Sequence, residues 1–142
     1  MNKFVIVADD SELVKRIIEN ALMGKYIVIK ASNGKEVMDF INNNDNENIA
    51  AVLLDLNMPE FDGFVVLDYF KNNRLFKKIP VSIISGDDSK ETISKAFSYD
   101  IVDMLHKPFN MRNVRNIIEK MENNKKVNWV LVQLTFLIYN FF

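Results

Sequence analysis

Short apolar segments alternate with amphipathic segments over most of the chain. The apolar segments are five in number, at residues 4–8, 26–29, 49–54, 79–84 and 101–105. Four of them are nearly continuous in Val, Ile and Leu, which is typical of parallel strands that are buried on both faces of a sheet. The segment at 26–29 is the shortest, so we expect it to form an edge strand.

Apolar residues between these strands repeat at the spacing of one helix face. The stripes are Leu13, Val14, Ile17, Ile18, Ala21 and Leu22; Val37, Met38 and Ile41; Phe64, Leu67, Tyr69 and Phe70; Ile93, Ala96 and Phe97; and Val114, Ile117, Ile118 and Met121. Asn110 is a candidate N-cap for the last helix. Strands that alternate with helices are joined by right-handed crossovers, which put helices on both faces of an open sheet. The pattern therefore predicts a doubly wound α/β domain with a five-stranded parallel sheet.

Residues 127–142 break this alternation. They carry no charge, and twelve of the sixteen are apolar. A helix of this length spans about 24 Å, less than the ~30 Å hydrocarbon core of a membrane, so we predict no membrane span. Because an apolar segment of this length does not stay exposed, we expect it to pack on its own domain or to form a homodimer through the region 101–142. Truncation or a change of reading frame is an alternative origin for it.

Length and composition narrow the class of protein. A chain of 142 residues suits one domain, which we place at residues 1–122, with 123–142 as an apolar tail or the start of a linker or output region. The 18 basic and 19 acidic residues leave a net charge of −1, which gives no basic field for direct nucleic-acid binding.

The rare residue types exclude several kinds of site. The chain has no cysteine, which excludes disulfides, thiolate catalysis and cysteine zinc sites. Its single histidine, His106, argues against a histidine-ligated metal. The first apolar segment is too short for the core of a signal peptide, so we expect a cytoplasmic protein.

Polar residues follow directly after four of the five predicted strands. These residues are Asp9 and Asp10, Asp55, Ser85, and Lys107. In an open parallel sheet, ligands bind beyond the carboxyl ends of the strands, where the strand order reverses. We therefore expect the fold to bring these side chains to one rim of the sheet.

The chemistry of that set points to a metal and a phosphoryl group. Three crowded carboxylates repel one another unless a cation neutralises them, and oxygen ligands without His or Cys favour Mg²⁺. A lysine ammonium and a serine hydroxyl could hold the oxygens of a phosphoryl group. A carboxylate can itself be the nucleophile and form an aspartyl phosphate.

Four short motifs occur in order, each at the end of a predicted strand. They are Val-Ala-Asp-Asp at 7–10, Leu-Asp-Leu-Asn-Met-Pro-Glu-Phe-Asp-Gly at 54–63, Ile-Ser-Gly at 84–86 and His-Lys-Pro-Phe at 106–109. With these motifs the sequence resembles a response-regulator receiver domain of two-component signalling, of the chemotaxis-regulator kind, over residues 1–122. The resemblance implies a flavodoxin-like sheet with the strand order 2-1-3-4-5.

The same resemblance implies the phosphoacceptor and the metal site. Asp55 would accept a phosphoryl group from a histidine kinase or a phosphotransfer protein. Mg²⁺ would be held by Asp10 directly, by Asp9 through water, by Asp55 and by the backbone carbonyl of Asn57.

Other residues would hold the phosphoryl group once Asp55 is modified. The resemblance assigns Lys107 to one of its oxygens and Ser85 to another, and it implies that Gly86 leaves room for the group. It also implies a cis peptide bond between Lys107 and Pro108.

Further positions would set the shape of the site and the lifetime of the phosphoryl group. Pro59 and Gly63 would shape the loop after the phosphoacceptor. Asn57 and Asp87 match the two positions that tune the loss of phosphate in receivers, and because both are short and polar we expect a moderate rate of hydrolysis.

The sequence departs from the receiver pattern near the fifth strand. Receivers carry Tyr or Phe three residues before the lysine, and this ring moves inward with the Ser or Thr on phosphorylation, whereas here the position is Met104. Methionine is flexible and can fill an irregular gap, so the switch could be differently wired. Residues 98–101, Ser-Tyr-Asp-Ile, also replace the usual small Gly-Ala.

The sequence predicts a phosphorylation-switched signalling module rather than an enzyme, one that assists its own phosphorylation and dephosphorylation. It would act alone, as chemotaxis or phosphorelay regulators do, or as part of a larger regulator. One alternative is a pseudo-receiver that binds partners without phosphate, which Met104 keeps open. Another is a phosphohydrolase of the haloacid-dehalogenase kind, but those enzymes end their first strand in Asp-x-Asp, whereas here it ends in Asp-Asp and Asp55 is followed by Leu-Asn.

Overall fold

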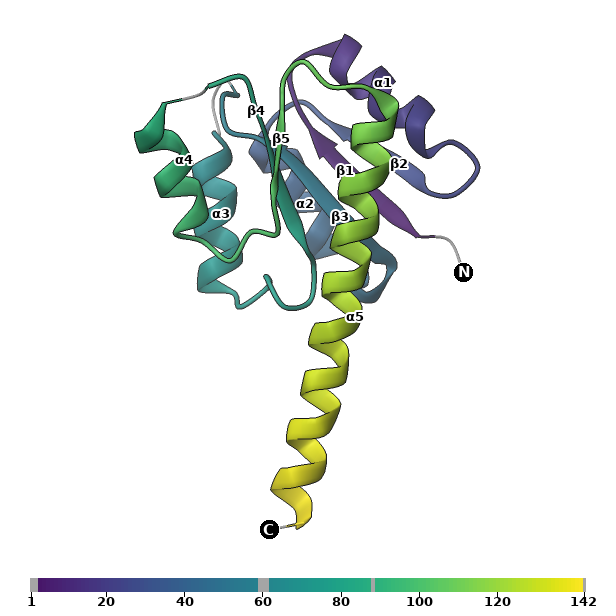
Figure 1. The fold of residues 1–142 in the computed structure, drawn as a ribbon, viewed down its shortest axis with the longest axis vertical. Helices are drawn as coiled ribbons and strands as arrows, with labels where there is room; N and C mark the ends of the chain where they lie inside the picture. Colours follow the sequence, from purple (N-terminus) through teal and green to yellow (C-terminus); the bar gives the residue numbers. More distant parts are fainter. Residues whose placement is uncertain (1–2, 59–61, 88, 142) are drawn as a thin grey trace.

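A computed structural model of the chain describes residues 3–58, 62–87 and 89–141. These residues form five strands and five α-helices, with one short 3-10 helix (Figure 1). The strands are β1 (Phe4–Ala8), β2 (Ile27–Ala31), β3 (Ile49–Asp55), β4 (Val81–Ser85) and β5 (Met104–His106). The helices are α1 (Glu12–Leu22), α2 (Gly34–Asn43), the 3-10 helix η1 (Asn46–Asn48), α3 (Gly63–Asn72), α4 (Lys90–Phe97) and α5 (Met111–Phe141).

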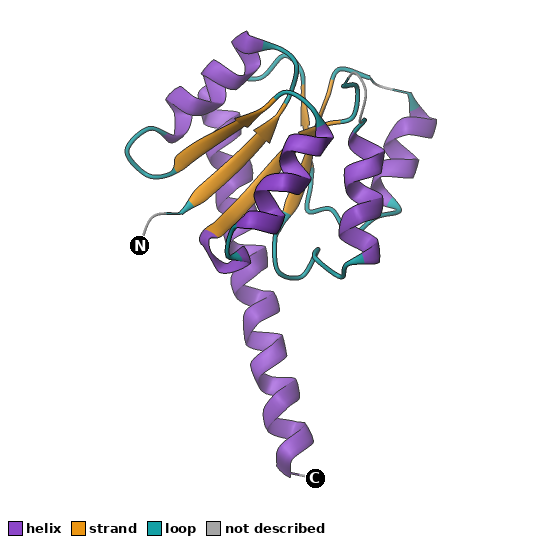
Figure 2. Cartoon of the chain, turned by 180° about the vertical axis from the view of Figure 1, so that it is seen from behind, coloured by secondary structure: helices purple, strands orange, loops and turns teal. Residues whose placement is uncertain are grey.

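The five strands pair in parallel as one sheet, in the order β2-β1-β3-β4-β5. Helices α1 and α5 pack on one face, and α2, α3 and α4 pack on the other (Figures 1 and 2). Strand order reverses between β1 and β3, so the carboxyl ends of these two strands meet at the switch point. The predicted doubly wound fold, its strand order and the edge position of the second strand are confirmed.

The central strand β3 divides the core into two halves. All seven of its residues are buried. Because side chains alternate along a strand, Val52 and Leu54 join the cluster beneath α2, α3 and α4, whereas Ala51 and Leu53 join the cluster beneath α1 and α5. Burial on both faces explains why this segment is continuously apolar.

The fifth strand is shorter than the predicted segment 101–105. Backbone pairing with β4 begins earlier, since the Val102 N–H donates to the Val81 carbonyl at 2.8 Å. Regular strand geometry begins only at Met104. Just before it, the Asp103 carboxylate accepts the Met104 N–H at 2.8 Å, so this N–H bonds to a side chain and not to a neighbouring strand. The strand then continues through His106, so that Lys107 follows it directly.

Two predicted apolar stripes include residues that prove exposed. In α1, Leu13 is 66% exposed, whereas Lys15 is 3% exposed. The Lys15 ammonium lies 3.3 Å from the Ser32 hydroxyl and 2.9 Å from the Glu12 carboxylate, so its aliphatic stem fills the buried position. Phe97, at the end of α4, is also exposed.

Helix α5 runs without a break from the domain into a projecting end (Figure 1). Its start is fixed by a reciprocal cap, in which the Asn113 N–H donates to the Asn110 side chain at 2.9 Å and the Asn110 N–H donates to the Asn113 side chain at 3.0 Å. The predicted cap is therefore confirmed. All four residues of the predicted stripe, Val114, Ile117, Ile118 and Met121, are buried.

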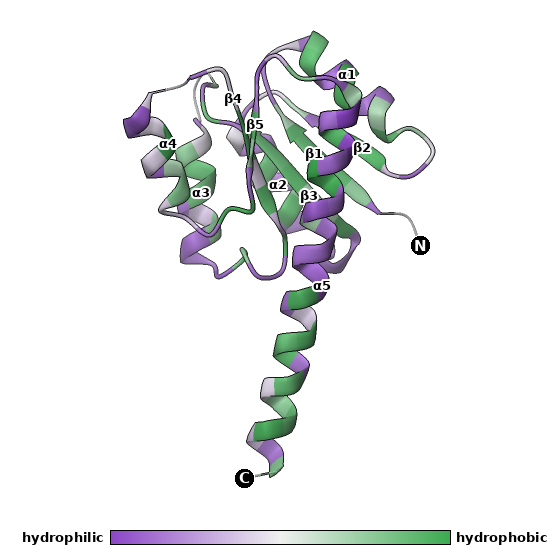
Figure 3. Ribbon diagram, viewed as in Figure 1, coloured by the Kyte–Doolittle hydropathy of each residue, from purple (hydrophilic) through white to green (hydrophobic). Residues whose placement is uncertain are grey.

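Residues 127–141, here called the extension, form the projecting end of α5 and are mostly apolar (Figure 3). Their large apolar side chains are 47–84% exposed. The predicted packing on the chain's own domain is wrong, because α5 leaves the sheet before the extension begins. Packing against a second copy stays a prediction. Within the described residues, no helix combines the length and the apolar character needed to cross a membrane.

Candidate functional site

Three carboxylates meet at the carboxyl end of the sheet. Asp9 and Asp10 follow β1, and Asp55 ends β3. Because β1 and β3 are neighbours in register, with Ala8 beside Leu54, the next residues of both strands lie side by side. One carboxylate oxygen from each of the three aspartates lies within 4.8 Å of the others. This set is here called the acidic site.

Asp9 is fully buried and is held by the start of α1. Its Oδ1 accepts the Ser11 N–H at 2.8 Å, and Ser11 in turn caps α1 by accepting the Val14 N–H at 3.3 Å. Its Oδ2 lies 2.9 Å from the Lys107 ammonium but, among the described residues, accepts no well-aligned hydrogen bond. Asp10 is exposed at the mouth of the site. Asp9 therefore has one oxygen held by a backbone N–H and one that is ion-paired with Lys107.

Asp55 is 3% exposed, and both of its carboxylate oxygens have partners. Oδ1 accepts the Asn57 N–H at 2.9 Å, and Oδ2 accepts the Lys107 ammonium at 3.2 Å. Burial raises the pKa of Asp55; the Asn57 hydrogen bond lowers it, the charge of Asp9 raises it, and Lys107 lowers it, with a raised pKa as the result. The Asp55 carboxylate is thus oriented by its hydrogen bonds, but burial disfavours its ionised form unless a cation lies nearby.

Lys107 connects two of the carboxylates. It follows β5, and its backbone N–H donates to the Ser85 carbonyl at 2.9 Å, which fixes the lysine beside β4. Burial works to lower the pKa of Lys107, but its hydrogen bonds and the charges of Asp9 and Asp55 outweigh it, so the pKa is raised. The peptide bond from Lys107 to Pro108 is cis, as predicted.

Ser85 is buried at the end of β4, and its hydroxyl is turned into the following loop. The hydroxyl accepts the Asp87 N–H at 3.0 Å and donates to the Asp87 carbonyl at 3.3 Å. It must break these contacts to reach a ligand at the acidic site. Beside it, Gly86 leaves open space, because an added Cβ would meet only the Lys107 side chain, at 3.9 Å.

The Asp87 side chain supports the start of α4, whose N-cap is Ser89. Its carboxylate accepts the Ser89 N–H at 2.8 Å and the Thr92 hydroxyl at 3.0 Å. These hydrogen bonds, from the Ser89 N–H first and from Thr92 second, lower the pKa of Asp87. Thr92 was not among the predicted residues, because a threonine three positions after a capping serine is an ordinary feature of a helix start.

Gly63 determines how closely α3 approaches the acidic site. A Cβ at this position would lie 2.6 Å from the Asp55 carbonyl oxygen and 2.8 Å from the Leu56 Cα, both backbone atoms. Only glycine allows this approach. Asn57 lies in the loop between β3 and Gly63 and is exposed. Pro59, predicted to shape the same loop, lies outside the described residues.

Met104 lies at the start of β5 and is buried. It belongs to the core cluster beneath α2, α3 and α4, against which Ile93 and Tyr99 also pack. Tyr99 donates a short hydrogen bond to Asp68 of α3, and this bond, followed by burial, raises the pKa of Tyr99 to about 12. The chain therefore packs an aromatic residue against the same core cluster, anchored to α3 from the loop before β5.

The acidic site fits a hard divalent cation. Three carboxylates face one ammonium, so the site carries an excess of negative charge. All ligand atoms are oxygens, which is the donor set that Mg²⁺ prefers. The buried Oδ2 of Asp9 is ion-paired with Lys107 but accepts no well-aligned hydrogen bond in the described part of the chain, so it can turn to a metal or to a water that the metal holds.

Comparisons with known proteins agree with this architecture. A sequence profile described as the response regulator receiver domain matches residues 5–119. Over 129 residues the chain is 31% identical to the two-component response regulator ARR2 of Arabidopsis thaliana, a match that covers 90% of this chain but only 19% of the plant protein. Over 117 residues it is 26% identical to a chemotaxis protein CheY homolog of Campylobacter jejuni, covering 81% of this chain and 88% of that protein.

Solved structures share the fold. The chemotaxis response regulator CheY4 of Vibrio cholerae superposes with a TM-score of 0.74 at 20% identity, over 85% of this chain and 99% of that one. The profile match spans most of the chain and includes the acidic site, β4 and β5. The chain belongs to the family of response regulator receiver domains.

Proposed function

We propose that this receiver domain accepts a phosphoryl group on Asp55 and thereby switches a two-component signalling pathway. The observation that carries the proposal is the setting of Asp55, a buried and oriented carboxylate beside two further aspartates and one lysine. Asp9 is also buried, accepts a backbone N–H and lies beside Lys107. What distinguishes Asp55 is its place at the end of β3, in the motif at 54–63 by which the sequence resembles a receiver domain. Receiver domains are phosphoacceptor modules of two-component systems, and this assignment extends that role to a named residue.

The residues divide the chemistry among themselves. A carboxylate oxygen of Asp55 attacks the phosphorus of a donor phosphohistidine, the P–N bond breaks, and the imidazole leaves with the electron pair and takes up a proton. The Asn57 N–H holds Oδ1, so the attacking group keeps its direction. Asp10, Asp55 and the Asn57 carbonyl, with Asp9 acting through water, would hold Mg²⁺, which would neutralise charge on the phosphoryl oxygens.

Lys107 and Ser85 would bind the oxygens of the phosphoryl group on Asp55. Lys107 keeps its charge, since its pKa is raised, and it exchanges an aspartate oxygen for a phosphoryl oxygen. Ser85 leaves its contacts with Asp87 to donate its hydroxyl to another phosphoryl oxygen. This exchange pulls on the loop that starts α4, so occupancy of the site reaches the surface of the domain.

Loss of phosphate would be moderately fast. Asn57 is short, and the Asp87 carboxylate is committed to the start of α4, so neither covers the site with a long side chain. The partners we propose are a histidine kinase or a phosphotransfer protein, and the proposed location is the cytoplasm.

Intact-mass measurement after incubation with Mg²⁺ and acetyl phosphate tests the proposal. We expect a mass gain of one phosphoryl group in the wild type and none in Asp55→Asn. Asp39→Asn is the matched control, because Asp39 is an exposed carboxylate of α2 paired with Lys35, and it should keep the adduct. An unmodified wild type would instead support a receiver that acts without phosphate, and turnover of a generic phosphate ester would support a phosphohydrolase.

A further inference from the structure

We propose that two copies of this chain associate through the outer face of the extension, the side of the helix that points away from the chain's own domain. The outer face consists of six residues, Val127, Val130, Leu134, Leu137, Ile138 and Phe141. This inference concerns a surface remote from the acidic site and does not depend on phosphoryl transfer.

The spacing of these residues is that of a helix that pairs with another helix. Val127, Val130, Leu134, Leu137 and Phe141 follow one another at intervals of three and four residues. Such alternation keeps one apolar seam facing a partner helix along a coiled coil. Ile138 flanks the seam on the same side of the helix.

The outer face cannot be covered by the chain's own domain. Successive residues of a helix turn by about 100°, so the side that is buried at Val114 and Met121 continues into the extension at Val132 and Phe136. The position of a pocket agrees, since Val132, Phe136 and Tyr139 share its lining with Lys77, which belongs to the domain. None of the six outer residues lines this pocket.

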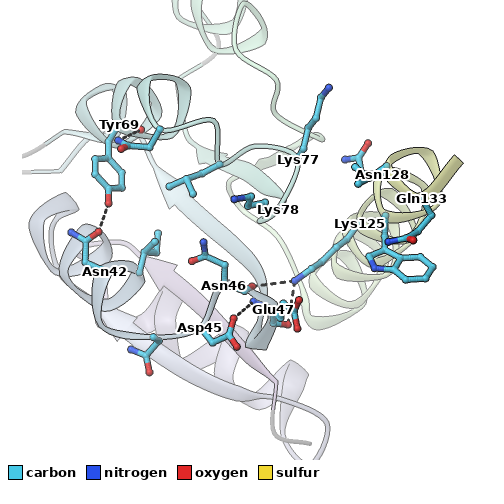
Figure 4. A pocket seen from close by; sticks show the side chains of 16 residues that line it. Asn42, Asp45, Asn46, Glu47, Tyr69, Lys77, Lys78, Lys125, Asn128 and Gln133 are labelled. Carbon is cyan, nitrogen blue, oxygen red and sulfur yellow. Dashed lines mark hydrogen bonds between the residues drawn. The ribbon is translucent and has the colours of Figure 1, made fainter. Parts of the chain in front are cut away.

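A second pocket lies on the same side of α5, the side that faces the domain and is here called the inner side. It has a volume of about 820 Å³ and lies where α5 leaves the sheet. Figure 4 shows Lys125 and Asn128 of α5 on one side of it, facing Lys78. Lys125 anchors the helix here by donating to the Ile49 carbonyl at 2.8 Å. The direction of α5, and therefore the exposure of its outer face, is fixed by contacts inside the domain.

The outer face changes character at the point where the domain ends. On this side of α5, the earlier turns carry Asn116, Glu119, Lys120 and Asn123, all polar and exposed. The extension replaces them with aliphatic residues and one aromatic residue. The outer face is therefore a separate apolar surface and not a continuation of the core.

The area suits a second copy. Five of the six side chains are aliphatic, so the lower value of about 150 Å² is taken for a full side chain, and the exposed fractions of 47–81% then leave roughly 500 Å² per copy. Two copies joined would bury roughly 1,000 Å², which is about the area that a biological interface has to reach.

The chemistry of the extension also favours an identical partner. It contains no charged residue, so two copies meet without repulsion, and it offers no charge by which to recognise an acidic or basic partner. On one flank of the helix, polar Gln133 and Asn140 lie between the outer face and the inner side. In a parallel pair, the apolar seam would end where Asn123 and Lys120 follow on the same side of α5. Lys120 forms an ion pair with Asp103 of its own domain at 2.9 Å, so its charge already has a partner there.

The oligomeric mass of the full chain tests the inference. We expect sedimentation velocity at micromolar concentration to give a dimer, and Leu134→Glu to give a monomer with an unchanged far-UV spectrum. Val132→Glu is the matched control, because Val132 is 55% exposed and Leu134 is 49% exposed, but Val132 lies on the inner side. It should stay dimeric. A monomeric wild type, or equal dissociation of both variants, would overturn the proposal.

Two further measurements separate a second copy from other occupants. The chain has no cysteine, so a single Leu134→Cys substitution should give a disulfide-linked dimer under oxidation, and Val132→Cys should not. The wild type should not float with neutral phosphatidylcholine vesicles. Flotation of a monomeric chain would assign the outer face to a lipid surface and sink the proposal.

Discussion

The acidic site and the extension depart in opposite directions from the usual arrangement of charged groups outside and apolar groups inside. At the acidic site, Asp9 and Asp55 are buried although both are acidic. In the extension, eleven large apolar side chains are about half exposed or more. The first departure is compensated within the chain, by Lys107 and by backbone N–H groups. The second has no compensation within the described residues, which is why it points to a partner.

Helix α5 contains the same contrast along its own length. Met121 is 0% exposed, and Leu137, four turns later, is 51% exposed, although leucine is at least as apolar as methionine. What differs is the neighbour: the first turns of α5 lie on the sheet, and the extension lies beyond it (Figure 3). Burial is therefore decided by where the helix passes, and apolar character alone does not decide it.

Alanine substitutions at these two positions should give the largest difference. Met121→Ala should lower the free energy of unfolding by about 2–5 kcal/mol, because it opens a cavity in a closed core. Leu137→Ala should change it by less than ~0.5 kcal/mol when the chain is dilute enough to be monomeric. Urea denaturation followed by circular dichroism measures both. Equal losses would mean that the extension folds against the domain.

Magnesium should stabilise the acidic site and leave the extension unaffected. A ligand that binds only the folded state adds about 2.7 kcal/mol at a concentration one hundred times its Kd, so a clear rise in Tm is expected. Asp10→Asn should reduce this rise, because Asp10 is one of three converging carboxylates and its exposure makes the change tolerable to the fold. Leu134→Glu should keep the full effect. The same rise in Asp10→Asn would place the metal elsewhere.

Alanine substitutions at two glycines next to the acidic site should distinguish a position with no room for a Cβ from one with room. Gly63→Ala should cost about 1–3 kcal/mol, since its Cβ would press on the backbone of Asp55 and Leu56. Gly86→Ala is the matched control and should stay within ~0.5 kcal/mol, because its Cβ would make only ordinary contacts. Thermal unfolding of both variants tests this. A tolerated Gly63→Ala would mean that α3 can move away from β3 freely.

The sequence was sufficient for the parts of the molecule that depend on order along the chain. Strand ends could be read from the apolar runs, and neighbouring parallel strands bring their ends together, so Asp9, Asp55 and Lys107 could be expected at one rim. Which of Leu13 and Lys15 is buried could not be predicted in this way. Both lie near the edge of the apolar helix face, and the burial of Lys15 depends on the contact between its ammonium and the Ser32 hydroxyl.

Other features depend on directions in space that no pattern of residues contains. The hydroxyl of Ser85 could be predicted to lie near the acidic site, but its present bonds to Asp87 depend on how the loop after β4 turns. The apolar extension was expected to be covered by something. Whether its own domain could cover it was settled by the angle at which α5 leaves the sheet, and that angle is fixed by packing near Met121 and by Lys125.

The smallest expected effect is the response to pH, and it distinguishes the two regions most directly. Burial and the charge of Asp9 raise the pKa of Asp55 in the folded state, so the folded protein takes up this proton before the unfolded chain does. The favourable contribution is therefore present at low pH and is lost as pH rises through the folded-state pKa. Without Mg²⁺, Asp55→Asn should be more stable than the wild type at pH 7, because the variant carries no charge that burial disfavours.

That advantage should shrink as pH falls toward 5, because the wild type then gains the proton that the variant never needs. Urea denaturation at both pH values measures it. The extension has no acidic, basic or histidine side chain, so dimer dissociation should not change over the same range. A constant difference between Asp55→Asn and the wild type would show that Asp55 is not strained by burial. A dimer that dissociates between pH 7 and pH 5 would show that charged groups of the domain, and not the outer face alone, hold the copies together.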